Sequence, residues 1–327
     1  MEMSNKTILL TGACGFIGHR VARELSSQGA RVVGIDSMND AYDPLIKRHR
    51  LEVLRGLEGF SWVEGDIEDT VLLDRLFEEN KFDAVLNLAA RAGVRYSMEN
   101  PTVYLQTNAQ GTLNLLERVQ RNEVGKIVLA STSSLYAGHP LPFDEEMPVN
   151  HPISSYAASK KAAEALCHSF SHLYDVDVSI VRYFTVFGPA GRPDMCIFRF
   201  IKWIDEGLPI QIYGTGEQRR DFTYVDDIAR GTIVAMKPLG YEIINLGGGM
   251  EPVSLLEVIS MIEGHLGKSA KLEFHDAHIA DLFESKAEIG KAKRLLGWEP
   301  EISFADGLER TVQWYVENRS WIADVTL

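Results

Sequence analysis

The chain has 327 residues, which is long enough for one large domain or two unequal domains. Hydrophobic residues make up 45% of it and charged residues 24%, as is typical of a globular protein with a sizeable core. Its 33 basic and 46 acidic residues give a formal net charge of −13, which argues against nucleic acid or an anionic membrane as a partner, because either requires a basic surface. No apolar run approaches the ~18 residues that cross a membrane, and the first residues lack a signal-peptide pattern.

The cysteines point to a reducing compartment. Cys14, Cys167 and Cys196 are odd in number, far apart and unpaired in their spacing. This usage favours free thiols in a cytoplasmic protein over a disulfide framework or a zinc site. The histidines complete no set of metal ligands, so we expect no bound metal.

The first half of the chain alternates short apolar strands with longer helical patterns. We expect strands over 7–11, 31–36, 60–66, 82–90, 125–132 and 176–184, and helices over 16–28, 43–55, 70–79, 101–121 and 155–174. Such alternation predicts an α/β fold with a doubly wound parallel (Rossmann) sheet. The basic run KRHR (47–50) in the second helix is expected to be a solvent-exposed helix face.

After residue 184 the loops lengthen and the helices become irregularly spaced. The stretch 242–248, EIINLGG, looks like one more strand that returns to the sheet. We therefore expect a nucleotide-binding domain over 1–183 plus 222–247. A second, smaller, mostly C-terminal α/β domain would comprise 184–221 plus 248–327 and bind substrate.

A glycine-rich segment follows the first strand and opens the first helix. In TGACGFIGHR, the glycines Gly12, Gly15 and Gly18 allow a tight turn, close approach of a pyrophosphate and close helix–strand packing. The helix N-terminus supplies free N–H groups to the phosphates. Asp36 ends the next strand about 20 residues on, where a carboxylate can accept the ribose hydroxyls. The three residues after Asp36 offer no cation for a 2′-phosphate, so the pattern favours NAD over NADP.

Tyr156 and Lys160 stand four apart at the start of a helical pattern and therefore share a face. A free tyrosine titrates near ~10 and is a poor base at neutral pH. A lysine ammonium one turn away stabilises the phenolate, which makes Tyr156 a usable acid/base group. The spacing alone is common, but here a nucleotide-binding half precedes it and a hydroxyl cluster, ASTSSLY (130–136), ends the fifth strand. The combination predicts hydride chemistry at a secondary alcohol.

With these motifs the sequence resembles the extended short-chain dehydrogenase/reductases, and within them the nucleotide-sugar epimerases. The resemblance covers essentially the whole chain and is carried by TGACGFIG, GDIED, AARAGVRYS, STSSLY, YAASK, RYFTVFGPAGRPDM and RRDFTYVDDI. It implies Tyr156 as general base, Lys160 on the nicotinamide ribose, Thr132 as the assisting hydroxyl and Arg220 on the nucleotide diphosphate. Two positions depart from the family: Ala137 stands where Gly is usual, and Arg91 where Gln is usual.

The resemblance extends to the remaining contacts. Asp66, after the third strand, is placed to touch the adenine, although an Asp that caps a turn fits its spacing equally well. Beside Tyr156 and Lys160, the cofactor is expected to contact Gly12, Gly15, Phe16, Ile17, Gly18, Asp36, Asp66, Ile67 and Ala89. The substrate is expected to contact Ser133, Arg95, Thr185, Arg192 and Arg220.

The residues immediately after Thr132 narrow the reaction. Related dehydratases carry a Glu and an Asp there, and UDP-glucuronate decarboxylases typically carry a Glu two residues before the tyrosine that ends the strand. This chain has Ser133 and Ser134, which favours simple 4-epimerisation. The loop that contains Thr185 and Arg192 resembles the corresponding loop of UDP-glucuronate 4-epimerases. An Arg fork there would match a sugar carboxylate, which a neutral CH₂OH group would not need.

Several alternatives stay open. Arg192 could instead pair with Asp194 or anchor the junction between the domains. A UDP-glucuronate decarboxylase and a neutral UDP-hexose 4-epimerase share most of the motifs, and an NAD-binding sensor could use the same fold.

The apolar faces of helices 101–121 and 155–174, together with the resemblance, lead us to expect a homodimer. The resemblance also implies a UDP-sugar as substrate.

Overall fold

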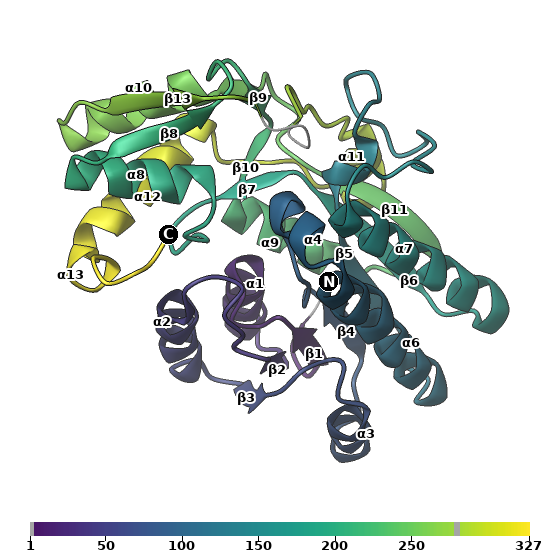
Figure 1. Ribbon diagram of the computed structural model, residues 1–327. Helices are drawn as coiled ribbons and strands as arrows, with labels where there is room; N and C mark the ends of the chain where they lie inside the picture. Colours follow the sequence, from purple (N-terminus) through teal and green to yellow (C-terminus); the bar gives the residue numbers. More distant parts are fainter. Residues whose placement is uncertain (1–2, 278–281) are drawn as a thin grey trace.

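A seven-stranded parallel sheet forms the centre of the computed structural model, which describes residues 3–277 and 282–327 (Figure 1). The strand order is β11-β6-β5-β4-β1-β2-β3. Successive strands are thus added on one side of β1 up to β3 and on its other side from β4 onward, so the order reverses between β1 and β4. Open sheets bind ligands at the carboxyl ends of the strands flanking such a switch. The strands are β1 (Thr7–Thr11), β2 (Arg31–Asp36), β3 (Phe60–Glu64), β4 (Ala84–Asn87), β5 (Ile127–Thr132), β6 (Val178–Tyr183) and β11 (Tyr241–Leu246). The predicted doubly wound sheet is confirmed, including the returning strand β11 beside β6.

Helices cover both faces of this sheet because its strands, apart from the edge strand β3, bury apolar side chains. One apolar cluster lies under α1, α2, α9 and α11, and a second lies under α3, α6 and α7 (Figure 1). Strands buried on both faces read as continuous apolar runs, which is why the sequence revealed them. The helices are α1 (Phe16–Ser27), α2 (Pro44–Arg55), α3 (Thr70–Glu79), α6 (Gly111–Arg121), α7 (Ser155–Tyr174), α9 (Val225–Val234) and α11 (Gly290–Leu296).

The segment predicted as one helix over 101–121 is interrupted. It consists of α5 (Pro101–Tyr104), a π-helical stretch η1 (Leu105–Gln110) and α6. The wide π turn brings the Asn108 amide against the loop after β4, where it accepts from Arg91 N (2.8 Å) and donates to Arg91 O (2.9 Å). It also donates to Ser159 Oγ on α7 (2.9 Å). A short helix that was not predicted, α4 (Val94–Glu99), precedes this segment.

A separate apolar core joins the later elements (Figure 1). It is built by α8 (Cys196–Glu206), α10 (Leu255–Leu266), α12 (Phe304–Glu317) and β8 (Pro209–Tyr213). Strand β13 (Lys271–His275) pairs in parallel with β8, but its side chains are not part of this core. Two small pairs connect this group to the large sheet. Strand β7 (Thr185–Phe187) pairs in parallel with β10 (Phe222–Tyr224), and β9 (Arg219–Arg220) pairs with β12 (Val253–Ser254).

The basic run on α2 is not a solvent-exposed face, and that prediction was wrong. Arg48 is exposed, but the side chains of Lys47 and Arg50 are 4% and 0% exposed. Both share a helix face with the buried Ile46 and Leu54. Helical periodicity therefore carries the two cations inward, where they meet polar groups of other segments.

The end of the chain returns to α2. Helix α13 (Arg319–Ile322) is followed by Thr326, whose N–H donates to the Asp43 carboxylate (2.7 Å). The ring of Trp321 stacks on His49 with centroids 4.5 Å apart. Within the described ranges, no helix combines the length and apolar character needed to cross a membrane.

Candidate active site

The glycine loop after β1 fits a dinucleotide because three backbone segments cross there without room for side chains. Gly12 has φ +67°, and a Cβ on it would lie 2.8 Å from Ala89 N. A Cβ on Gly18 would lie 2.0 Å from Gly12 O, so both positions require glycine. Gly15 caps α1 with no side chain, which leaves the first N–H groups of the helix to a phosphate.

Asp36 ends β2 as predicted, and a lysine that was not predicted lies beside it. The carboxylate accepts from Cys14 N (3.0 Å) and Met38 N (2.9 Å), which fixes its orientation at the edge of the cavity. Lys47 from α2 lies 3.7 Å from Asp36 Oδ1 and also donates to Asn39 Oδ1 (3.1 Å). A cation therefore stands beside the position predicted for the ribose, although none occurs in the three residues after Asp36.

The residues predicted to form the acid/base pair lie on the first turns of α7. Ser154 caps this helix by accepting from Ala157 N (3.1 Å), and Tyr156 and Lys160 follow one turn apart. Desolvation raises the pKa of Tyr156, and its contacts with Thr132 and Arg192 oppose that shift. Burial lowers the pKa of Lys160 to about 8, with Glu164 acting in the opposite direction. Thr132 ends β5, where its hydroxyl accepts from Ser134 N (3.1 Å).

A buried polar network supports these groups from beneath. Glu164, one turn after Lys160, forms a two-pronged ion pair with Arg182 of β6 (2.7 and 2.9 Å) and accepts from Ser131 Oγ (2.7 Å). Arg182 also donates to Tyr136 Oη (2.8 Å), which donates to Asn245 of β11 (2.8 Å). The network ties the helix with the acid/base pair to three neighbouring segments, and the sequence motifs gave no hint of it.

Thr185 begins β7 and Arg192 lies on the loop after it, and both line the same cavity. Arg192 donates through Nε to Asp194 Oδ1 (3.0 Å) and through Nη2 to Asp194 Oδ2 (2.6 Å). Burial opposes ionisation of Arg192, but the charge of Asp194 outweighs it and raises the guanidinium pKa. The pairing that the sequence left open thus exists, and it leaves Nη1 outside the fork. The guanidinium also lies 5.4 Å from the centre of the Tyr42 ring.

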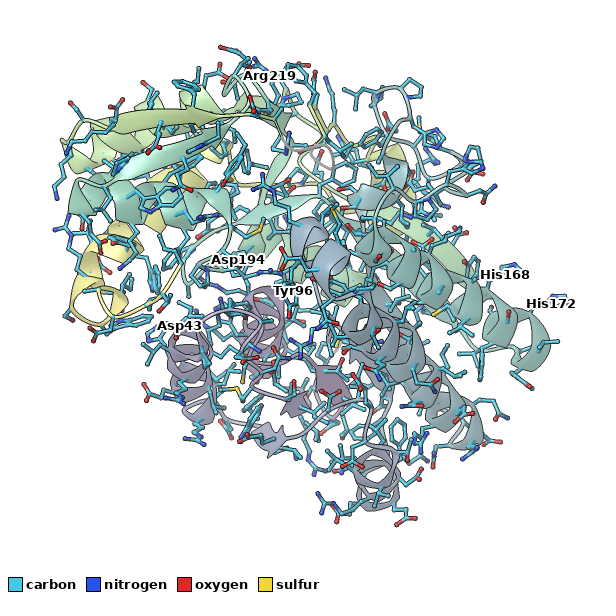
Figure 2. All side chains as sticks on the ribbon, viewed as in Figure 1. Asp43, Tyr96, His168, His172, Asp194 and Arg219 are labelled. Atoms are coloured by element: carbon cyan, nitrogen blue, oxygen red, sulfur yellow. The ribbon has the colours of Figure 1, made fainter. Side chains whose placement is uncertain are left out.

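One continuous cavity of about 730 Å³ joins all of these groups between the sheet edge and the second group of elements. Asp194 lies in the middle of the molecule in Figure 2, between these two parts. The residues expected to bind cofactor or substrate all line the cavity: Gly12, Gly15, Phe16, Ile17, Gly18, Asp36, Asp66, Ile67, Ala89, Arg95, Thr132, Ser133, Tyr156, Lys160, Thr185, Arg192 and Arg220.

The cavity also contains residues that sequence reasoning missed. They include Tyr42, Lys47, Tyr104, Arg199 and Trp203, whereas Asp194 was considered only as a partner of Arg192. Arg199 on α8 is the most informative of them, because its Nε is buried and has no hydrogen-bond partner among the residues that the structure describes. In the sequence, only its closeness to the loop that carries Arg192 could have suggested that Arg199 belongs to the site.

The geometry can be compared with known proteins. The chain is 55% identical over 317 residues to the UDP-glucuronate 4-epimerase of Thermodesulfobacterium geofontis, covering 97% of this chain and 98% of that protein. The crystal structure of UDP-glucuronic acid 4-epimerase from Bacillus cereus, in complex with UDP-glucuronic acid and NAD, aligns with a TM-score of 0.89 at 36% identity, covering 95% of this chain and 99% of that one. The UDP-glucose 4-epimerase of Thermotoga maritima, solved with UDP-glucose, aligns with a TM-score of 0.87 at 29% identity, covering 96% and 99%.

A family model matches residues 8–247, the greater part of the chain. The matched residues include the glycine loop, Tyr156, Lys160 and the loop that carries Arg192. The chain belongs to the NAD dependent epimerase/dehydratase family.

Proposed function

We propose that the chain is an NAD-dependent 4-epimerase that interconverts UDP-glucuronate and UDP-galacturonate without net oxidation. The observation that carries this proposal is the arrangement within one cavity. An acid/base pair, Tyr156 and Lys160, faces a glycine loop fitted to a dinucleotide, and Arg192 lines the same space.

Tyr156 is proposed to take the proton from the sugar O4 and later to return it. Thr132, buried at the end of β5, holds the same oxygen by hydrogen bonding, and Lys160 stabilises the phenolate. NAD, when bound, accepts the hydride from C4 and returns it to the opposite face of the ketone. Tyr156, Lys160 and Glu164 lie on the same helix, which Glu164 ties to its neighbours. We therefore expect the position of the ammonium relative to the phenol to stay the same during turnover.

Arg192 and Thr185 are proposed to hold the C6 carboxylate. Once C4 is a ketone, that carboxylate is β to it, and a β-keto acid loses CO₂ when the C5–C6 bond aligns with the carbonyl π system. A guanidinium that keeps the carboxylate near the carbonyl plane suppresses this loss. No such grip is needed for a sugar with a neutral CH₂OH, which favours a uronate over a neutral hexose.

The diphosphate and uridine are proposed to lie toward the second group of elements. Arg220 on β9, Arg199 on α8 and Arg95 on α4 line that part of the cavity. Arg95 stacks on the Tyr213 ring at 4.4 Å. Three cations from three elements can neutralise a diphosphate although the whole chain is strongly acidic.

The wider organisation is also a proposal. We assign residues 1–183 plus 222–247 to NAD binding and residues 184–221 plus 248–327 to the nucleotide sugar. A homodimer would form through 101–121 and 155–174, where Leu105, Leu173 and Tyr174 are at least half exposed. The three cysteines are free, which fits a cytoplasmic enzyme.

A product assay tests the function. NAD-loaded protein is incubated with UDP-glucuronate or with UDP-glucose, and the sugars are followed by NMR. We expect UDP-galacturonate from the first and little turnover of the second. A UDP-pentose with CO₂ would instead identify a decarboxylase, turnover of UDP-glucose alone would identify a neutral-sugar epimerase, and no product from either would leave an NAD-binding protein without this activity.

The assignment of the carboxylate grip has its own test. Arg192→Ala should lower turnover of UDP-glucuronate strongly and leave binding of UDP nearly unchanged, because UDP has no uronate group. An unchanged rate with UDP-glucuronate would show that Arg192 does not hold the carboxylate.

A further inference from the structure

Arg50 is a fully buried cation on α2 whose five N–H groups are all used. Nε and Nη2 both donate to Ala190 O, at 3.0 and 2.8 Å, and Nη2 also donates to Gly191 O at 3.0 Å. Nη1 donates to Cys14 O (3.0 Å) and to Tyr42 Oη (2.7 Å). Every one of these partners is neutral, which is unusual for a side chain that carries a charge into the interior.

The carbonyl partners identify what Arg50 connects. The carbonyl of Gly191 belongs to the peptide group whose nitrogen is that of Arg192. The carbonyl of Cys14 belongs to the peptide group that leads into Gly15, the cap of α1. One guanidinium therefore holds the cofactor loop and the backbone next to the carboxylate-binding side chain at the same time.

The turn that Arg50 holds needs external support. Ala190 has φ +56°, in the left-handed region that costs a non-glycine residue about 1 kcal/mol or more. Two carbonyls of the turn, at positions 190 and 191, point to a single guanidinium, which fixes the orientation of both peptide planes. A lysine cannot reproduce this fork, because its ammonium is a compact point charge.

We propose that Arg50 is a positioning residue that acts through Arg192: it fixes the loop so that the sugar carboxylate is held near the carbonyl plane and epimerisation outcompetes decarboxylation. The inference rests on the proposed function, because it concerns the fate of a uronate that has been oxidised at C4. Arg50 itself does not line the cavity, so its effect reaches the substrate only through the residues it holds.

The competing side reaction is loss of C6 from the oxidised sugar. The C5–C6 bond of the 4-keto uronate breaks, C6 leaves as CO₂, and the electron pair passes into the C4 carbonyl as an enolate. The enolate takes a proton at C5 and yields a UDP-4-keto-pentose. When the UDP-4-keto-pentose leaves the site, the hydride removed from C4 stays on the cofactor as NADH. When the ketone is reduced in place, C4 takes the hydride back and the product is a UDP-pentose.

The test measures a partition ratio, CO₂ released per UDP-galacturonate formed, with UDP-glucuronate labelled at C6. A partition ratio is independent of how much protein is folded, because unfolded molecules make neither product. Arg50→Lys and Arg50→Gln should raise it about tenfold, the change that a ~1.4 kcal/mol shift between two competing barriers produces. The CO₂ released should equal the sum of the NADH and the UDP-pentose formed.

Arg118→Met is the matched control. Arg118 is also buried and donates to two carbonyls, Asn114 O (3.0 Å) and Thr70 O (3.1 Å), but it contacts neither loop that Arg50 holds. We expect it to lower the melting temperature and leave the partition ratio unchanged. A rise as large as that of the Arg50 variants would overturn the proposal, because it would make the effect a general result of destabilisation.

A double variant tests whether Arg50 acts through Arg192. In an Arg192→Met background the grip is already lost, so adding Arg50→Lys should not raise the partition ratio further. An additive rise, or single Arg50 variants that epimerise with the wild-type ratio, would overturn the inference and leave the proposed function standing. If the wild-type protein itself forms no UDP-galacturonate, the proposed function fails.

Discussion

Arg192 and Asp194, two residues apart on the loop after β7, form a fork of two charge-assisted hydrogen bonds (3.0 and 2.6 Å), and both side chains line the cavity. The guanidinium proposed to receive the sugar carboxylate thus already carries one carboxylate of the protein. A second carboxylate must either share the guanidinium through Nη1 or displace Asp194. In both cases the two negative charges repel each other.

Asp194→Asn should therefore lower the KM for UDP-glucuronate. The side chains of the pair are 19% and 36% exposed, so the effect should stay within about 1 kcal/mol, or roughly fivefold in KM. Steady-state kinetics with UDP-glucuronate measure this directly. Inhibition by UDP-glucose provides the control, since a neutral sugar should gain nothing from the substitution. A higher KM for the uronate would show that Asp194 orients Arg192 and does not compete with the substrate.

Tyr156→Phe should abolish most turnover while the protein still binds NAD and UDP-glucuronate. The phenol is the group placed to exchange a proton with O4, and loss of such a group costs about 10²–10⁴ in kcat. Isothermal titration should find NAD and UDP-glucuronate binding nearly unchanged. Turnover within a few-fold of the wild type would exclude Tyr156 as the acid/base group.

Lys160→Met should stabilise the protein near neutral pH, and the gain should shrink as the pH rises. Burial lowers the folded-state pKa of Lys160 from 10.5 to about 8. Below pH 8 the folded chain bears the full cost of a buried ammonium, at most about 3 kcal/mol, and this cost disappears as the pH rises from 8 to 10.5. Urea unfolding of variant and wild type at pH 7 and pH 9.5 tests the sign. Lys161→Met, on a more exposed side of the same helix, corrects for the general effect of net charge.

Asp36→Ser should shift the cofactor preference toward NADP. It removes the carboxylate that repels a 2′-phosphate and leaves Lys47, now 3.7 Å from Asp36 Oδ1, to accept it. We expect the ratio of NADP to NAD affinity to rise roughly tenfold or more. Titration calorimetry with both cofactors measures it. The double variant Asp36→Ser/Lys47→Met should lose the NADP gain, and an equal gain without Lys47 would contradict the role given to that cation.

The features predicted from the sequence are those that local chemistry determines. The glycine loop, Asp36 at the end of a strand and the helical spacing of Tyr156 and Lys160 each depend on neighbours within one turn or one strand. Their meeting in one cavity is a result of the parallel sheet, because carboxyl ends of neighbouring strands share an edge. The bounds of the predicted strands accordingly lie within three residues of the observed ones.

The features that could not be predicted depend on distant partners. The solvent-exposed position predicted for Arg50 was wrong because its acceptors, Ala190 and Gly191, lie 140 and 141 residues away along the chain. A signal did exist, since Arg50 shares a helix face with Ile46 and Leu54, and a cation in that register must be buried. The π turn at Leu105–Gln110 had no such signal: its side chains match an ordinary helix, and Asn108 within it contacts Arg91 and Ser159, which belong to other segments.

The stacked pair of His49 and Trp321 provides the protein with an internal optical probe. A protonated imidazole quenches the fluorescence of an indole it touches, and burial lowers the pKa of His49, so quenching should set in only below the usual imidazole range. Because His49 and Arg50 are neighbours on α2, a loss of that acid quenching would report that the end of the chain has left the helix that carries Arg50. The chain has five tryptophans, so the signal of this pair is the part of the acid quenching that a Trp321→Phe variant loses.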